Sequence, residues 1–362
     1  MHNKFQVIRC EQYIFQGDTF SVEQAENFFK EYDTDCDTIL TSVWEVPYYK
    51  MSTNWRQGYK NLVQTAKRKL KGRIFVILDS WYQPYYSDLL DPAVDDVLII
   101  DYFLVRIYNE VVVKKLCDFK KIPDVKSTFL FLTGKPSKLN RTRLLYKLQQ
   151  KNLLENNIWS FYPIKDKISQ GHSTLPEITV DEYINFIDKY QRQPDSVKFE
   201  SYGNSHFFLP VPYDVNLYNN TGFSIVPETT FNNTNVFDTV FLTEKTWIPI
   251  LNNHAFIIAG IPGILKQLST MGFKTFEEYL PVKYDGIVDH EQRLNAIVEN
   301  VEFLVNNIKS LENNIVNDIG YNHQHFIKLA LTNIDSVINF AKMHDWQISN
   351  LEDIVKTADK TL

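Results

Sequence analysis

The sequence predicts an α/β protein with two Rossmann-like domains that face each other across a cleft, followed by C-terminal helices. Short apolar runs alternate with amphipathic stretches, which is typical of parallel strands covered by helices on both faces. The alternation starts again near residue 126, after the polar stretch "DFKKIPDVK". From residue 291 onward the pattern is helical. We therefore expect α/β domains at 1–125 and 126–290, and a helical tail at 291–362 packed on the body.

Length and composition are those of a globular protein. The chain has 362 residues, of which 44% are hydrophobic and 23% charged, enough for two domains with cores of their own. It contains no run of about 18 apolar residues and starts without an apolar signal segment. Cys10, Cys36 and Cys117 have neither metal-binding spacing nor the pattern of a disulfide framework. We therefore expect a cytoplasmic protein without a membrane span.

The first domain is predicted from one helix signal and three strand signals. Ser21 and Gln24 form a capping box at the start of "SVEQAENFFKEY". Buried parallel strands are predicted for the three continuous apolar runs, which lie at 38–46, 73–81 and 95–103.

The second domain repeats the order of strand, loop and helix. A strand at 128–132 leads through a Gly/Pro/Ser loop into an amphipathic helix. "FSIVPET" and "AFIIAG" are further strands, and "TEKTWIPILNN" and "PGILKQLSTMG" are helices with their loops. In the tail, apolar residues from Leu294 to Ile315 recur every three or four positions. This spacing fits a coiled-coil seam or, as we expect, one stripe packed on the domain; "SVINFAKMHDW" is predicted to form another helix.

A basic loop-to-helix junction, "LTGKPSKLNRTR", follows the predicted strand at 128–132. Ligands bind at the carboxyl ends of parallel strands in open α/β sheets. Gly134 allows close approach of the backbone, and Lys138, Arg141 and Arg143 supply cations that can hold phosphate oxygens. A solvated basic turn would have the same composition.

A second junction, "TEKTW", follows an apolar run and opens an apolar helix. Thr243 can be the N-cap, with Glu244 and Lys245 as ordinary charges of the first turn. Alternatively, the helix start is an anion site. For a nucleoside diphosphate, Lys245 has the chemistry to neutralise the pyrophosphate, and Glu244 can accept hydrogen bonds from the ribose hydroxyls.

The ordered set "NRTR", "SIVPET" and "VFLTEKTWIPILNNHAFIIAG" resembles the donor-binding half of GT-B glycosyltransferases. It is most similar to the α1,3-fucosyltransferase family and to related glycosyltransferase-like proteins of large viruses and phages. The resemblance covers roughly 126–290. It implies that Glu244 binds the ribose, that Lys245 and Arg141 bind the pyrophosphate with Arg143 as the alternative to Arg141, and that Glu228 faces the donor.

The implied reaction transfers a hexosyl or pentosyl group from a nucleotide-sugar to a hydroxyl of a glycan or other acceptor, with inversion and without a metal or other cofactor. Such a transfer needs a general base for the acceptor hydroxyl. Asp79 and Glu45, at the ends of predicted strands in the first domain, are the candidates, although each can be an ordinary loop carboxylate. An Asp-x-Asp triplet can bind the metal ion of a metal–nucleotide-sugar complex. The triplet at 33–35, however, lies in a polar loop with no strand ahead of it, so we expect transfer without a metal.

Two other functions remain open from the sequence. The first is a viral or phage glycosyltransferase acting in the host cytoplasm on a modified base in DNA. A net charge of −6, with one short basic stretch at 67–73, does not favour a nucleic-acid partner. The second is a non-catalytic module of the same fold that binds a glycan or a partner protein.

Overall fold

The computed structural model describes about three fifths of the chain, in two compact units. The described residues are 5–9, 21–42, 53–79, 94, 96–109, 127–133, 139–161, 185, 186, 189, 215–231, 240 and 242–346. Unit 1 comprises Met1–Arg106, Thr234–Thr239 and Lys328–Leu362, and unit 2 comprises Ile107–Asn233 and Val240–Ile327. Within the described ranges, each unit contains one four-stranded parallel sheet with helices, which confirms the α/β class and fits two Rossmann-like units.

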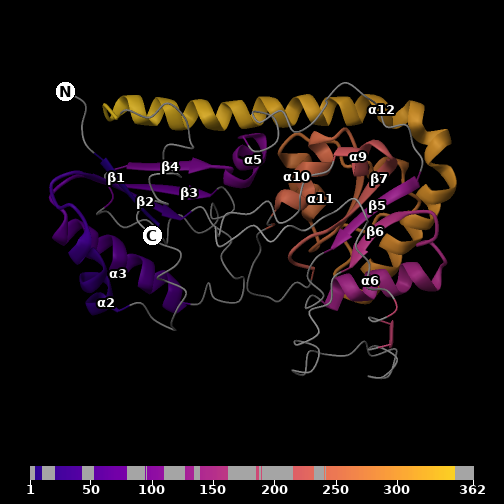
Figure 1. Ribbon diagram of the computed structural model, residues 1–362, viewed down its shortest axis with the longest axis horizontal. Helices are drawn as coiled ribbons and strands as arrows, with labels where there is room; N and C mark the ends of the chain where they lie inside the picture. The colour runs from indigo at the N-terminus through magenta and orange to yellow at the C-terminus, as the bar shows by residue number, and fades with distance from the viewer. Residues whose placement is uncertain are drawn as a thin grey trace. The chain divides into compact units, whose positions relative to one another are not determined.

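The sheet of unit 1 has its strands side by side in chain order (Figure 1). The strands are β1 (Phe5–Arg9), β2 (Asp37–Ser42), β3 (Ile74–Asp79) and β4 (Asp96–Ile100). All neighbouring pairs are parallel. The central strands are apolar and buried on both faces, for example from Ile74 to Ile77, as expected for a parallel sheet between helices.

Within the described residues, unit 1 contains three α-helices besides the helix of the tail. They are α2 (Val22–Phe28), α3 (Thr53–Lys69) and α5 (Tyr102–Ile107). Helix α2 begins with the predicted capping box of Ser21 and Gln24. Strand β4 ends at Ile100, before the predicted end of its apolar run. The reason is that the Asp101 carboxylate accepts a hydrogen bond from the Leu104 amide at 3.2 Å and starts α5 there.

The sheet of unit 2 has the order β6-β5-β7-β8, again all parallel. Its strands are β5 (Ser127–Thr133), β6 (Ile158–Phe161), β7 (Thr221–Pro227) and β8 (Ala255–Ala259). The chain runs from β5 outward to β6 and then returns to the other side of β5, where it forms β7. The strand order therefore reverses between β5 and β7, and this topological switch point is where open α/β sheets bind ligands, at the carboxyl ends of the strands.

Within the described residues, unit 2 contains four α-helices besides the helix of the tail. They are α6 (Leu139–Gln150), α9 (Val215–Asn219), α10 (Glu244–Leu251) and α11 (Ile264–Thr270), with a short 3₁₀ helix, η5 (Glu277–Tyr279). Helices α9 and α10 pack against β7, and α10 also packs against β8. The residues after β7 and β8 and the starts of α6 and α10 thus lie at the carboxyl edge of this sheet.

The tail forms one helix, α12 (His290–Met343), of 54 residues (Figure 1). The predicted separate helix at 336–346 is therefore wrong. The apolar stripe is buried, from Leu294 and Ile297 to Ile315. The part up to Ile327 belongs to unit 2, and the part from Lys328 belongs to unit 1.

Two buried asparagines of α12 hold the loop between α11 and α12. Asn322 accepts from the Lys274 amide at 2.7 Å and donates to the Lys274 carbonyl at 2.9 Å. Asn300 forms the same pair of bonds with the backbone of Val282, at 3.1 and 2.8 Å. Polar residues inside the apolar stripe therefore satisfy the backbone of a packed loop.

Candidate functional site

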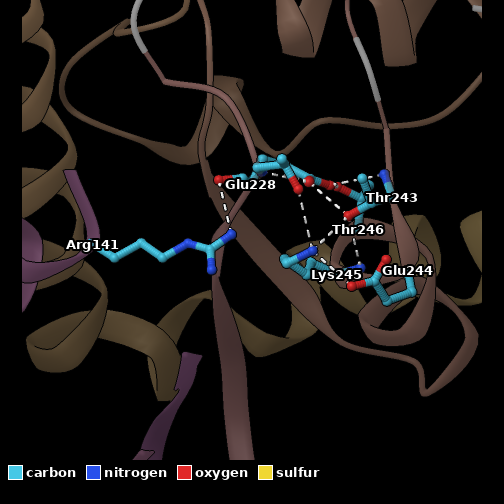
Figure 2. Close-up of polar contacts among 7 residues, drawn as sticks. Arg141, Glu228, Thr243, Glu244, Lys245 and Thr246 are labelled. Carbon is cyan, nitrogen blue, oxygen red and sulfur yellow. Dashed lines mark hydrogen bonds and ion pairs between the residues drawn. The ribbon is translucent and has the colours of Figure 1, made fainter. Parts of the chain in front are cut away.

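The switch point of unit 2 brings together residues from both predicted junctions. Glu228 directly follows β7, and Arg141 lies in the first turn of α6, which follows β5. The Arg141 guanidinium donates from Nη2 to the Glu228 carbonyl oxygen at 3.4 Å (Figure 2). Both residues are buried, with exposed fractions of 3% and 0%. Residues far apart in the sequence thus meet at the edge where a ligand is expected.

The Glu228 carboxylate is tied to the start of α10. Its Oε1 accepts from the Thr243 amide at 3.1 Å and the Thr246 hydroxyl at 2.6 Å. Its Oε2 accepts from the Thr243 hydroxyl at 2.7 Å and the Thr229 amide at 3.1 Å. A carboxylate offers about four acceptor positions, and burying its charge requires such donors. Glu228 therefore organises the loop and the helix start.

Thr243 is the N-cap of α10, in extended backbone geometry. Its carbonyl accepts from the amides of Thr246 and Trp247 at 3.0 and 3.3 Å. Its hydroxyl accepts from the Lys245 amide at 3.4 Å. The helix-start interpretation of "TEKTW" therefore describes Thr243 correctly.

Glu244 and Lys245 form a partly buried ion pair beside this cap. The Lys245 ammonium lies 2.6 Å from the Glu244 carboxylate, and the two side chains are 24% and 13% exposed, respectively. The same ammonium also donates to the hydroxyls of Thr243 and Thr229, at 3.1 and 3.4 Å. Figure 2 shows both charged groups at the helix start, on the side where Thr243 and Glu228 meet. Because water reaches them only in part, their interactions are screened less than those of a surface pair.

Arg143, the alternative to Arg141, is held by α12. Its guanidinium lies 3.2 Å from the Glu291 carboxylate, which is also paired with the Lys147 ammonium. Glu291 belongs to the first turn of α12, where a carboxylate is favoured by the helix dipole. Of the two arginines predicted for the phosphate, Arg141 contacts the Glu228 segment and Arg143 contacts α12.

The amino ends of α10 and α11 both receive a carboxylate of the chain itself. Glu228 binds the cap of α10, as described above. Asp285 accepts from the amides of Leu265 and Lys266, at 2.9 and 3.0 Å, at the start of α11. Helix N-termini are common anion sites, and here both are occupied internally. An anionic ligand at this edge would therefore have to bind mainly through cationic side chains.

Arg293 is a residue at this edge that sequence reasoning missed. It is 1% exposed, and its guanidinium donates to main-chain carbonyls after β7, after β8 and before α12. The sequence did contain a signal, since Arg293 lies four residues before the buried Ile297 on the apolar stripe of α12. A charged residue at a buried stripe position indicates a specific buried partner.

The carboxyl edge of the unit 1 sheet holds one predicted base. Asp79 is the last residue of β3, and its backbone is in register with Ile100 of β4. Asp101, which sequence reasoning did not consider, follows Ile100 directly. Burial raises the pKa of the Asp101 carboxyl to about 6, although its hydrogen bond from the Leu104 amide acts in the opposite direction. Glu45, Gly134 and Lys138 lie outside the described residues.

Two histidines of α12, His323 and His325, contact backbone carbonyls. His323 Nδ1 bonds to the Leu251 carbonyl at 2.8 Å, and His325 Nε2 bonds to the Met271 carbonyl at 2.7 Å. These carbonyls lie at the C-terminal ends of α10 and α11, where donors are needed. In the described parts of the chain, no group of three His, Cys, Asp or Glu residues is placed to hold a metal ion.

Comparison with known proteins adds no family assignment. No family model, no curated protein and no solved structure matches this chain. Among the described helices, none combines the length and apolarity needed to cross a membrane. The functional interpretation therefore depends on the geometry of the site and on the resemblance in its motifs.

Proposed function

We propose that this protein is a glycosyltransferase that moves a sugar from a nucleotide-sugar donor to an acceptor hydroxyl, with the donor bound at the carboxyl edge of the unit 2 sheet. The observation that carries the proposal is the meeting of Arg141 and Glu228, 87 residues apart in sequence, at the switch point of that sheet. The network of Glu228 extends from there to Lys245 and Glu244. These are the residues to which the resemblance to α1,3-fucosyltransferases assigns the donor.

The Glu244–Lys245 pair suggests how the donor binds. In the free protein each charge is the partner of the other, 2.6 Å apart. A nucleoside diphosphate offers a pyrophosphate to the ammonium and ribose hydroxyls to the carboxylate. The ligand therefore replaces one ion pair by two charge-assisted contacts, and neither charge is left buried without a partner.

The proposed reaction is an inverting displacement at the anomeric carbon. A carboxylate base accepts the proton of the acceptor hydroxyl as the new glycosidic bond forms, and the nucleoside diphosphate leaves with the electrons of the broken bond. Lys245 and Arg141 neutralise the charge that develops on the leaving group. Asp79 is the proposed base among the described residues, with Glu45 as the alternative.

The basic stretch near the end of α3 does not favour a nucleic-acid acceptor. Arg68, Lys71 and Arg73 lie 3.8, 3.0 and 2.6 Å from carboxylates of unit 1, those of Glu26, Asp35 and Asp37. A phosphate backbone would have to compete with these carboxylates for the three cations that they pair with.

The non-catalytic alternative has one observation in its favour. Glu228, Glu244 and Lys245 are all hydrogen-bonded or paired within the chain, as residues of a purely structural helix start would be. Nucleotide binding separates this alternative from the proposed enzyme.

The Lys245→Ala variant tests the proposal. Loss of a charge-assisted contact of roughly 1.5–3 kcal/mol should weaken binding of the best nucleotide about tenfold or more. That nucleotide is chosen by a thermal-shift screen of UDP, GDP, CDP and ADP, and its affinity is measured by calorimetry. Lys151→Ala, which removes a half-exposed lysine paired with Glu302 in the same unit, is the matched control. A parent protein that binds none of the four, or equal affinities of parent and Lys245→Ala, would refute the proposal.

A further inference from the structure

Arg293 places a buried positive charge at the edge where the proposed donor binds. Its guanidinium Nε donates to the Gly260 carbonyl at 3.2 Å, and its Nη1 donates to the carbonyls of Ile287 and Val288 at 2.6 and 3.1 Å. Nη2 donates to the Phe231 carbonyl, and the guanidinium carbon lies 4.3 Å from the centre of the Phe231 ring. One side chain thus joins three loop segments at the same edge of the sheet.

Two of the Arg293 bonds, those to the carbonyls of Gly260 and Phe231, lie on either side of the Glu228 backbone. The Glu228 amide donates to the Ala259 carbonyl at 3.0 Å, and Arg293 holds the carbonyl of the next residue, Gly260. On the other side, Arg293 holds the carbonyl of Phe231, three residues after Glu228. The backbone of Glu228 is therefore fixed between two points that Arg293 binds, and the Glu228 carboxylate in turn fixes Thr243.

We infer that Arg293 is a positioning residue for the donor site, acting through Glu228 on the "TEK" segment. Displacement of the Glu228 segment would move the carboxylate that binds Thr243 and Thr246, and with them the start of α10 that carries Glu244 and Lys245. A shift of about 1 Å in such a supporting group is enough to lower ligand affinity strongly. This inference rests on the proposed function in so far as it concerns the donor.

The chemistry of the guanidinium explains why an arginine stands there. Its planar fork offers five N–H donors in fixed directions, whereas a lysine ammonium is a single point with three. Burial lowers the pKa of Arg293 to about 10, while the nearby Asp285 and Asp289 act in the opposite direction. The charge is therefore kept at neutral pH, and carbonyls from four residues are satisfied by one side chain.

The test compares Arg293→Met with Asn322→Leu. Asn322 is a matched control because it is also a buried polar residue of α12 in unit 2 that holds a loop backbone, that of Lys274. Hydrogen exchange of the backbone amides at 228–231 and 243–247 is measured by mass spectrometry. We expect exchange there to rise about tenfold or more in Arg293→Met and less than about threefold in Asn322→Leu.

The second readout is affinity for whichever of UDP, GDP, CDP and ADP the parent binds best, measured below the melting temperature of every variant. We expect Arg293→Met to weaken binding about tenfold or more and Asn322→Leu less than about twofold. Arg293→Lys retains the charge but not the planar fork of donors. The logarithm of its affinity should fall by at least half as much as that of Arg293→Met. Arg293→Lys also serves as the folded variant if Arg293→Met does not fold.

The outcomes separate the two proposals. If the parent binds no nucleotide, the glycosyltransferase proposal fails, and the exchange comparison still decides whether Arg293 orders Glu228 and the "TEK" segment. If Arg293→Met and Asn322→Leu change exchange at these two segments equally, Arg293 has only a general structural role and the inference is overturned. Parent-like affinity and exchange in Arg293→Lys would also overturn it, because charge alone would then suffice.

Discussion

The two sheets each carry a buried carboxylate at the end of a strand, and the two carboxylates are satisfied in different ways. In unit 1, Asp37 at the amino end of β2 binds the Arg73 guanidinium at 2.6 and 3.2 Å and the Trp346 indole N–H at 3.0 Å. In unit 2, Glu228 at the carboxyl end of β7 binds threonine hydroxyls and backbone amides. The first carboxylate has a cationic partner, and the second has only neutral donors.

This difference fits a structural contact in unit 1 and the ligand site that we propose in unit 2. Pairing Asp37 with Arg73 neutralises both charges, and the bond from Trp346 fixes the residue just after α12 to the unit 1 sheet. Glu228 is satisfied without a cation on its carboxylate, so the nearby Lys245 and Arg141 can serve a ligand without leaving Glu228 unsatisfied. Sites that bind charged ligands commonly keep such charges in partly buried, preorganised positions.

Removal of the Glu228 charge should give the largest loss of stability. In Glu228→Gln the amide NH₂ would face donors that need an acceptor, and one backbone amide, that of Thr229 or that of Thr243, would be left unsatisfied. We expect the free energy of unfolding of unit 2 to fall by about 3 kcal/mol. Asp37→Asn should lower that of unit 1 by about half as much, because Arg73 is 43% exposed and can be hydrated.

Hydrogen exchange during urea unfolding gives the free energy of unfolding of each unit separately. A single two-state fit to the whole chain would not distinguish the two units. Equal losses in Glu228→Gln and Asp37→Asn would show that neutral donors and a cation hold the two carboxylates equally well. A loss below about 0.5 kcal/mol in Glu228→Gln would remove Glu228 from the role of organising the site.

Acid should lower the stability of unit 2 more than that of unit 1. His254, buried at the start of β8, donates from Nε2 to the Tyr218 carbonyl at 2.7 Å and bonds to Ser224 at 2.9 Å through Nδ1. Burial lowers its pKa from 6.5 to about 4, although its bonds to backbone carbonyls oppose this. The folded state thus favours the neutral ring. Stability is complete above pH 6.5 and falls as the pH drops to 4, by up to about 3 kcal/mol at 1.36 kcal/mol per pKa unit.

Asp37 gives the contrast in unit 1. Burial raises its pKa, but the bonds from Arg73 and Trp346 outweigh burial, and the pKa is lowered below 3.8. Its contribution to stability is therefore present above pH 3.8 and is lost only at lower pH. Between pH 6.5 and 4, unit 2 should weaken while the Asp37 contacts persist. His254→Gln, which retains a donor and an acceptor but does not titrate, should reduce the slope in unit 2 and leave the share of His290 and His323, whose pKa values burial also lowers; an unchanged slope would assign it to groups other than His254.

Features encoded within a few residues could be predicted from the sequence. The capping box of Ser21 and Gln24 and the strands at 38–42 and 74–79 depend on spacings of two to four residues, which the amino-acid pattern shows directly. The position of Arg141 could be predicted because the carboxyl ends of parallel strands share an edge, whereas Glu228 was indicated by the resemblance of the motifs.

The rest depends on partners that carry no sequence pattern. Arg293 binds backbone carbonyls, one of them 62 residues away, and any residue supplies a carbonyl. The Glu228 carboxylate accepts hydrogen bonds from Thr243 and Thr246, which lie 15 and 18 residues later in the sequence. Nothing in the length of the intervening segment indicates these contacts. The continuity of α12 was missed because the regular apolar spacing was followed only to Ile315; beyond it, polar residues such as Asn322 are buried by their bonds to loop backbone.

The Glu244→Gln variant has the smallest expected effect. It tests whether Glu244 is only a first-turn charge of the helix or binds the ribose of the ligand. Glutamine can still accept from Lys245, but the charge of the partly buried ion pair and the favourable interaction with the helix dipole are both lost, so stability should fall by about 1 kcal/mol or less. A ribose hydroxyl, however, bonds more strongly to a carboxylate than to an amide. We expect the best ribonucleotide to bind about fivefold more weakly, a loss of about 1 kcal/mol.

The 2′,3′-dideoxy form of the same nucleotide supplies the control, because it has no ribose hydroxyls for either side chain to accept. It should bind parent and Glu244→Gln about equally, and more weakly than the ribonucleotide binds the parent. Calorimetry with both proteins and both nucleotides gives the coupling between the carboxylate and the hydroxyls directly. If the ribonucleotide binds the two proteins with equal affinity, Glu244 is only a first-turn charge that favours the helix start, and the unit 2 network would resemble the structural contact of Asp37 more than a ligand site.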